Sequence, residues 1–105
     1  VHHIFPKSEF PEIAHYLENL IKLTATQHFT KAHPNNRTQV INRDYQLVCL
    51  LAKSQTIESC LAVGDTFYRK ESFVKVINVG LNENLDEALT FAAIREFLVH
   101  HYIQF

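Results

Sequence analysis

Residues 1–7 read VHHIFPK, and this stretch decides how the rest of the chain is interpreted. Two adjacent histidines, His2 and His3, stand in an apolar segment, and Pro6 and Lys7 follow them. Successive side chains of a strand point to opposite faces, so two neighbouring imidazoles cannot do the same job in the same direction. Either one ring packs while the other is exposed, or the two have different roles around one centre.

Length and composition indicate one small domain with a modest core. The chain has 105 residues, of which 47% are hydrophobic, with only 2 glycines and 3 prolines. Such a composition favours helices over a turn-rich sandwich or barrel. No apolar run approaches the roughly 20 residues of a membrane span, and the start does not resemble a signal peptide. Because there is no initiator Met, we expect Val1 to be a domain boundary with further domains upstream.

Cysteine usage and charge give weaker indications. Cys49 and Cys60 are 11 residues apart without a CxxC pair, so we expect two buried, reduced thiols, no structural zinc knuckle and a reducing cytoplasm. The net charge of −1 argues weakly against a nucleic-acid binder. Five of the 7 histidines lie in the first third of the chain, and this clustering carries more information than the charge.

The first third predicts a small hairpin followed by a short helix. Thr24 and Gln27 have the spacing of a capping box, which predicts a helix start. That helix has to end near Ala32, since the residue before Pro34 disfavours the α region. The predicted order is strand, loop, strand and helix, over 1–4, 5–16, 17–23 and 24–32.

The remainder, residues 39–105, predicts a helical region that braces the first 38 residues. Asp44 is a plausible cap for a helix, which continues or restarts at Ser54 and stops at Gly64. Residues 71–80 fit a helix ending at Gly80, although their β-branched side chains also allow a strand. The strongest pattern is a helix over 84–105 that Asn84 caps, with acidic residues in its first turn.

Several imidazoles and one asparagine form the candidate constellation. A hairpin whose second strand leads into a helix brings the first strand beside the start of that helix. His2 or His3 would then face His28, and Asn19 lies on the second strand. Nitrogen ligands at this density suit Zn²⁺, Ni²⁺ or Mn²⁺, and Mg²⁺ less strictly.

The segments HHIFPKS and LENLIKLTATQHFTKAH together resemble the HNH motif of the ββα-metal endonucleases, over residues 1–33. The resemblance implies that His2 is a metal ligand, that His3 is the general base and that Asn19 holds the loop and orients the base. It implies a second ligand at His28, nine residues after Asn19. The implied fold class is α+β, with an N-terminal ββα-metal hairpin-helix motif followed by a mainly α-helical C-terminal extension.

The last ligand departs from the family pattern. The family commonly has a ligand four residues after the helix histidine, where this chain has Ala32, and the next histidine is His33. Five residues turn a helix by about 500°, which moves His33 off the face of His28. If the helix ends at Ala32, however, His33 leaves the helix and is able to turn back to the metal.

The resemblance also implies the chemistry. A neutral imidazole takes a proton from water at neutral pH, and a divalent ion stabilises the charge that develops on the phosphodiester. We therefore expect a metal-dependent DNA endonuclease, or the nuclease domain of a restriction-type enzyme, that uses Mg²⁺ or Mn²⁺, with Zn²⁺ or Ni²⁺ as alternatives. The candidate phosphate contacts are Lys7, Lys22, Lys31 and Arg37.

Two other functions stay open. One is a catalytically degenerate ββα-metal module that binds DNA or a protein partner, which the net charge of −1 and the shifted His33 favour. The other is a metal-dependent hydrolase of small phosphoesters. The helical region is a candidate face for DNA contacts or for a homodimer. A second histidine pair, His100 and His101, has no asparagine and histidine at motif spacing after it, so we interpret it as structural or as part of the surface.

Overall fold

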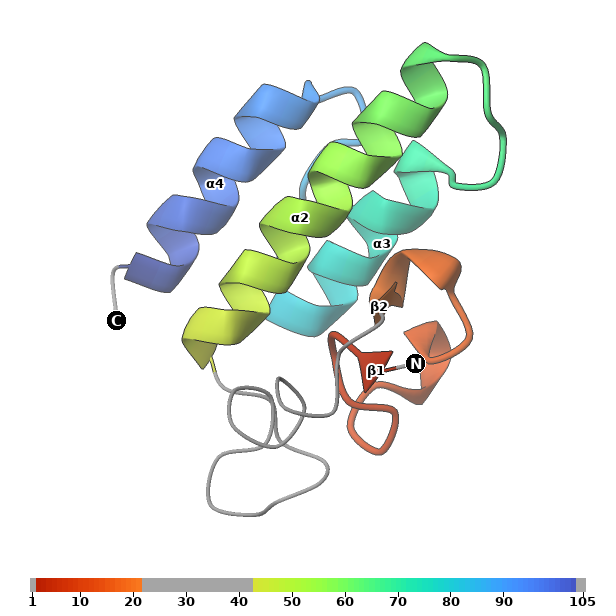
Figure 1. Ribbon diagram of the computed structural model, residues 1–105. Helices are drawn as coiled ribbons and strands as arrows, with labels where there is room; N and C mark the ends of the chain where they lie inside the picture. Colours follow the sequence, from red (N-terminus) through yellow and green to blue (C-terminus); the bar gives the residue numbers. More distant parts are fainter. Residues whose placement is uncertain (1, 22–42, 104–105) are drawn as a thin grey trace.

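A computed structural model describes residues 2–21 and 43–103 of the chain. Within these residues a two-stranded antiparallel sheet and three α-helices form a mixed α+β fold (Figure 1). The elements follow in the order β1 (His2–His3), the 3₁₀ helices η1 (Pro11–Ile13) and η2 (Leu17–Asn19), β2 (Leu20–Ile21), α2 (Arg43–Ala62), α3 (Lys70–Leu81) and α4 (Phe91–Ile103).

The hairpin strands are shorter than the sequence predicts. β1 ends at His3 because the chain bends at Ile4 and Phe5, whose side chains enter the core. The start of the predicted second strand is the 3₁₀ helix η2, so the expectation of a strand from residue 17 is wrong. In η2 the N–H of Leu20 donates to the carbonyl oxygen of Leu17, and the side chain of Asn19, rather than a strand ladder, satisfies the backbone of Phe5.

The helix α2 is continuous from Arg43 to Ala62, so the chain continues through Ser54 rather than restarting there. Ser54 is completely buried, and its hydroxyl donates to the carbonyl oxygen of Leu51 at 2.8 Å. A buried polar group of this kind is tolerated inside a helix because its hydrogen bond is made locally.

The segment that allowed either a helix or a strand is the helix α3. It buries Phe73, Val74, Val76 and Ile77, which form one stripe at helical spacing. The helix runs through Gly80 and ends at Leu81, followed by Asn82 in the left-handed conformation with φ of 55°. The prediction that Gly80 ends this helix is therefore wrong. A Cβ at Gly80 would overlap the ring of Phe5, so the glycine permits close packing instead.

The helix α4 begins later than predicted. The expectation of a helix capped by Asn84 is wrong, because α4 runs from Phe91 to Ile103. Asp86 instead accepts a hydrogen bond from the backbone N–H two residues on, which forms a turn. The side chain of Thr90 accepts from the N–H of Ala93 at 3.1 Å, so Thr90 is the residue that caps the helix.

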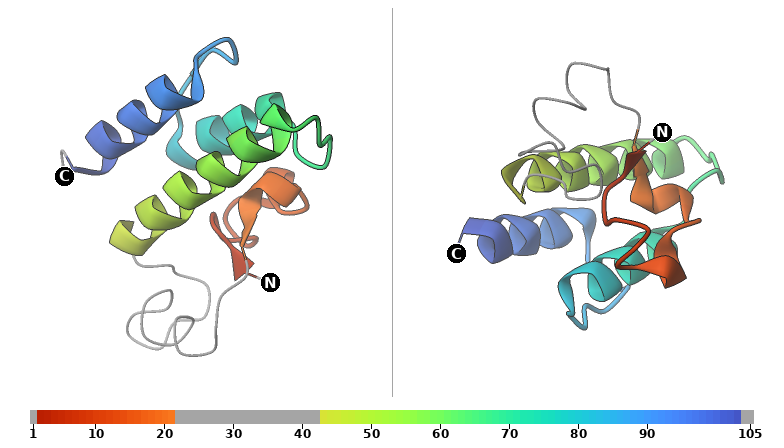
Figure 2. Two further views of the ribbon diagram at one scale, coloured as in Figure 1. Left: turned by 45° about the horizontal axis from the view of Figure 1, so that its top comes forward. Right: turned by 90° about the horizontal axis from the view of Figure 1, so that it is seen from below.

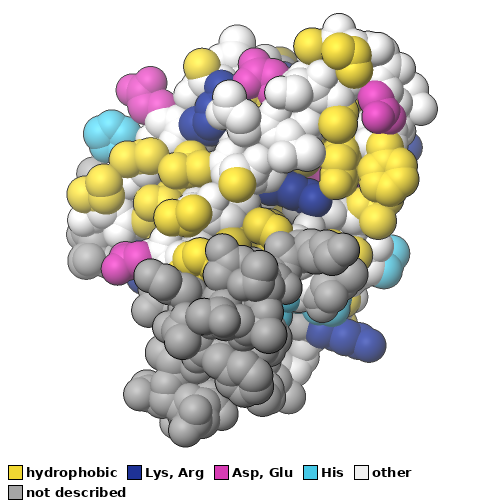
Figure 3. All heavy atoms as spheres, viewed as in Figure 1, with side chains coloured by type: hydrophobic (Ala, Val, Ile, Leu, Met, Phe, Trp, Pro, Cys, Tyr) yellow, Lys and Arg dark blue, Asp and Glu magenta, His cyan; other side chains and the backbone are white. Residues whose placement is uncertain are grey.

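The hairpin and α4 lie on opposite sides of α2 (Figures 1 and 2). α3 packs against the two 3₁₀ helices of the hairpin loop, and α2 packs mainly against α4. Hydrophobic side chains also gather on the outer face that α2 and α4 present (Figure 3). The fully buried large side chains of the core are Phe5, Phe73, Ile4, Ile13, Leu50, Ile57, Ile77, Ile94, Leu98 and Val76.

Both cysteines lie on α2 as free thiols, as the sequence predicts. Cys49 is buried, and its burial raises the pKa of the thiol to about 11. Cys60 is only half-buried, which corrects the expectation that both thiols are buried. None of the helices in residues 43–103 combines the length and the apolar character that crossing a bilayer requires.

Candidate functional site

The ring of His3 is anchored to the loop that follows β1. Its Nε2 lies 2.8 Å from the carbonyl oxygen of Ala14, and the side chain is half-buried. A carbonyl oxygen only accepts hydrogen bonds, so Nε2 is the donor in this contact. In a neutral imidazole, Nδ1 is then the nitrogen that keeps a lone pair. This bond fixes both the tautomer and the orientation of the ring.

Asn19 connects the two sides of the same loop. Its Oδ1 accepts from the N–H of Phe5 at 2.9 Å, and its Nδ2 donates to the carbonyl oxygen of Phe5 at 3.1 Å. Nδ2 also lies 3.3 Å from the carbonyl oxygen of Ile13. The side chain is completely buried, so these contacts satisfy polar groups that would otherwise be buried without partners.

The residues that Asn19 contacts are close in sequence to His3 and to Ala14, which accepts the hydrogen bond of His3. Phe5 is two residues after His3, and Ile13 is directly before Ala14, which holds the imidazole. Asn19 therefore fixes both the strand that carries His3 and the loop segment that accepts its hydrogen bond. The backbone adds a further contact, because the N–H of Ile4 donates to the carbonyl oxygen of Asn19 at 2.8 Å.

Gln46 on α2 holds the strand from the other side. Its Nε2 donates to the carbonyl oxygen of Ile4 at 2.8 Å, and its Oε1 accepts from the hydroxyl of Tyr102 at 2.5 Å. Burial raises the pKa of Tyr102 well above its usual value, so this hydroxyl remains a donor at neutral pH. Gln46 therefore links the residue after His3 to α4.

Glu18, directly before Asn19, connects the loop to α3. It is 5% exposed, and its Oε2 accepts from the N–H of Arg69, the residue before the first turn of α3, at 2.8 Å. An acidic group at this end of a helix also interacts favourably with the helix dipole. Sequence reasoning missed Glu18 and Gln46, because their partners lie 51 and 42 residues away and no local pattern relates them.

His2 and Lys7 are the other predicted site residues that the structure describes. His2 is half-buried on β1, opposite Ile21, while His3 is opposite Leu20. Lys7 is exposed in the turn after Pro6, so its long, charged side chain lies in solvent.

The remaining predicted residues lie outside the described ranges. They are the proposed metal ligands His28 and His33 and the proposed phosphate contacts Lys22, Lys31 and Arg37. Residues 2–21 and 43–103 alone contain no group of three His, Cys, Asp or Glu side chains that could hold a metal ion. Of the three predicted ligands, these ranges include His2 only, so the full ligand set stays a prediction.

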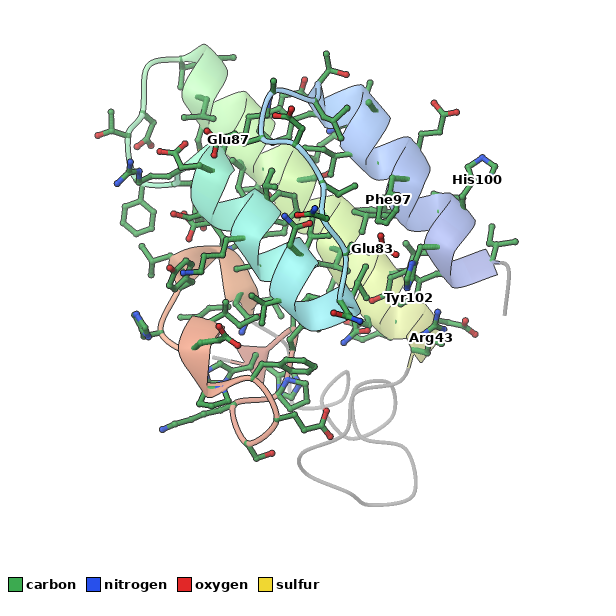
Figure 4. The ribbon with its side chains drawn as sticks, turned by 180° about the vertical axis from the view of Figure 1, so that it is seen from behind. Arg43, Glu83, Glu87, Phe97, His100 and Tyr102 are labelled. Carbon is green, nitrogen blue, oxygen red and sulfur yellow. The ribbon has the colours of Figure 1, made fainter. Side chains whose placement is uncertain are left out.

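The second histidine pair lies in the last turn of α4. His100 is exposed on α4 and points away from the helices (Figure 4). The Nδ1 of His101 is 3.5 Å from a carboxylate oxygen of Glu83, close to the stacked Arg43 and Tyr102. The contact of His101 joins the end of α4 to its neighbours, whereas His100 lies on the surface, so the two residues divide between the structural and the surface role expected for the pair.

Comparison of the chain with protein-family models, with curated proteins and with solved structures found no match in any of the three.

Proposed function

We propose that this chain is a metal-dependent endonuclease of the HNH type, which hydrolyses DNA phosphodiester bonds with His3 as the general base. The observation that carries the proposal is the anchored ring of His3, whose Nε2 contacts the carbonyl oxygen of Ala14 at 2.8 Å. Because that bond assigns the hydrogen to Nε2, Nδ1 is the nitrogen that takes a proton from water. A fixed tautomer is what a general base needs.

Asn19 is the positioning residue for this base. It fixes Phe5 on the side of the strand and Ile13 on the side of the acceptor loop, so it limits the movement of the imidazole between them. Catalytic groups held by packed, hydrogen-bonded neighbours keep their geometry without reorganisation during the reaction.

In the proposed mechanism His2, His28 and His33 hold one divalent ion. When bound, the ion stabilises the negative charge that develops at the phosphate and on the leaving oxygen. His2 is next to His3 in β1, and side chains of adjacent strand residues diverge. The resemblance to the HNH motif assigns His2 to the ion and His3 to the water. Mg²⁺ or Mn²⁺ is the proposed ion, with Zn²⁺ or Ni²⁺ as alternatives that suit imidazole ligands.

Lysine and arginine side chains supply the proposed contacts to DNA phosphates. Lys7 is exposed on the turn that follows β1, within the same loop that holds His3. With Lys22, Lys31 and Arg37 it forms the proposed basic set. Such contacts position the duplex and make its binding dependent on salt, without reading its sequence.

A plasmid-nicking assay with Mg²⁺, Mn²⁺ and Ni²⁺ tests the proposal. The informative variant is His3→Gln, because glutamine retains a donor for the carbonyl oxygen of Ala14 but has no basic nitrogen. We expect its cleavage rate to fall by about 10²–10⁴-fold. His100→Ala is the matched control, since it removes an exposed histidine that is not part of the proposed site. Full activity in His3→Gln would exclude His3 as the base.

The same assay separates the alternatives. A folded protein that binds DNA but cleaves none with any ion would support a degenerate ββα-metal module, which the net charge of −1 favours. A hydrolase of small phosphoesters would act on such substrates without competition from unlabelled duplex DNA.

A further inference from the structure

A hollow of about 270 Å³ lies between the hairpin and α2, outside the histidine site. Leu17, Leu20 and Ile21 form its apolar wall, and Lys53 and Tyr68 contribute its polar groups. Pockets that bury drug-sized ligands have volumes of about 300–1,000 Å³. This hollow therefore suits a smaller group, about the size of one nucleotide base.

The polar end of the hollow is positively charged. The ammonium of Lys53 donates to the hydroxyl of Tyr68 at 3.0 Å and lies 4.4 Å from the centre of its ring. An ammonium has three donors, so this bond to Tyr68 leaves capacity for a ligand oxygen. Among the described residues that line the hollow, Lys53 alone has an ionised side chain, so its charge is complementary to a phosphate.

The register of the sheet relates this hollow to the histidines. Ile21 is opposite His2 and Leu20 is opposite His3 in the antiparallel pair. Residues opposite each other in such a pair have Cα atoms only about 4.5–5.5 Å apart. An unpaired strand whose phosphate lies at His3 therefore has its neighbouring nucleotide beside Leu20 and Ile21, which line the hollow.

We propose that the hollow is a nucleotide subsite, in which a base packs against Leu17, Leu20 and Ile21 and a phosphate next to it contacts the ammonium of Lys53. The inference rests on the proposed function, since it takes the ligand to be the DNA strand held at the histidines. An apolar wall accepts the face of any base, so the subsite selects unpaired nucleotides rather than a particular sequence.

Equilibrium binding in EDTA tests the subsite separately from cleavage. The probe is a fluorescent single-stranded oligonucleotide, compared with the same oligonucleotide carrying abasic residues. We expect the wild-type protein to bind the intact probe at least about 5-fold more tightly, which corresponds to burial of roughly 40 Å² of apolar surface at about 25 cal/mol per Å². Leu17→Ser should remove this preference and still fold, because Leu17 is 41% exposed.

The contribution of Lys53 is measured through the salt dependence of binding. Lys53→Gln retains a donor for Tyr68 but loses the charge, so the slope of log affinity against log salt should fall by about one. Lys75→Gln is the matched control, because Lys75 also lies over a tyrosine ring, 5.5 Å from the centre of Tyr16, but not in the hollow. Its salt slope should remain closer to that of the wild type.

The results of these measurements separate this inference from the nuclease proposal. A base preference that depends on Leu17 supports the subsite even if no variant cleaves plasmid. Equal binding of intact and abasic probes, or no binding of either, overturns the subsite even if the protein nicks DNA. A preference that survives in Leu17→Ser, or equal salt slopes for the two lysine variants, also overturns it.

Discussion

Two asparagines of this protein make the same kind of contact with the backbone. Asn19 bonds both the N–H and the carbonyl oxygen of Phe5, and Asn78 does the same for Leu85, at 2.8 and 3.1 Å. In each case one amide satisfies the backbone of a loop residue that lies outside the sheet and the helices. The two asparagines differ in position, since Asn78 lies on α3 and holds the connection to α4.

This similarity makes Asn78 a control for the role of Asn19. Substitution by alanine leaves buried backbone groups unpaired, which costs about 1–3 kcal/mol for each group. We expect Asn19→Ala to lower the free energy of unfolding by about 3 kcal/mol, and Asn78→Ala by less because it loses fewer bonds and is only half-buried. Urea denaturation measures both values.

The same pair tests whether Asn19 positions the base. At a temperature where both variants are folded, Asn19→Ala should reduce plasmid nicking at least about 10-fold, whereas Asn78→Ala should retain wild-type activity. An equal loss of activity in both variants would mean that Asn19 acts only through stability.

At this scale the sequence indicates candidate site residues but not the residues that hold them in place. His3 and Asn19 are identified by spacing within one motif, so local reasoning reaches them. Glu18 and Gln46 depend on partners that only the folded chain brings near, at Arg69 and Ile4. No periodic pattern in the sequence predicts these contacts.

At the scale of the elements, the hairpin loop and α3 meet at Phe5 and Gly80. The ring of Phe5 occupies the space that a side chain at position 80 would need, and Phe5 is only 2% exposed. Glycine is usually unfavourable in a helix by about 1 kcal/mol relative to alanine. Here the close packing of the loop offsets that cost.

We expect Gly80→Ala to destabilise the protein, although alanine is the better helix former. Forcing an extra methyl group into packed side chains costs about 1–3 kcal/mol, which exceeds the gain in helix propensity. The double variant Gly80→Ala with Phe5→Leu should recover part of the loss, because leucine lacks the ring that overlaps. Thermal unfolding of the two single variants and the double variant measures this coupling.

Gly64 provides the control for this substitution. It has φ of +83°, and no atom of the described residues lies within 4 Å of the place that an added methyl group would take. Gly64→Ala is therefore unfavourable only through its backbone conformation. Phe5→Leu should leave the cost of Gly64→Ala unchanged. Additive effects of Phe5→Leu and Gly80→Ala would contradict the proposed packing between loop and helix.

The sequence predicts the helices better than it predicts the residues at which they begin and end. The apolar spacing predicts α2 and leaves a helix among the two possibilities for α3. The predicted start of α4 is wrong by seven residues. Asparagine often caps helices, but after Asn84 the chain forms turns as far as Thr90. The bonds from Asn78 to Leu85 hold this segment in a non-helical path, and no local pattern indicates that tie.

On the scale of the whole molecule, the helical region supports the hairpin through a chain of side chains. The hydroxyl of Tyr102 on α4 donates to Gln46 on α2, which in turn donates to the carbonyl oxygen of Ile4. The end of α4 is held in addition by Arg43, which stacks on Tyr102 near Glu83 (Figure 4). The mixed α+β class that the sequence predicts is the one observed in the described residues.

In the proposed nuclease, His2 and His28 bind one shared cation while His3 remains next to it as the base. Anomalous diffraction from a crystal soaked in Mn²⁺ measures this most directly. We expect one anomalous peak at about 2.0–2.3 Å from a ring nitrogen of both His2 and His28, as metal–imidazole bonds require. Rings of His2 and His28 more than about 10 Å apart, with no shared peak, would contradict it, because no single ion can then bond to both.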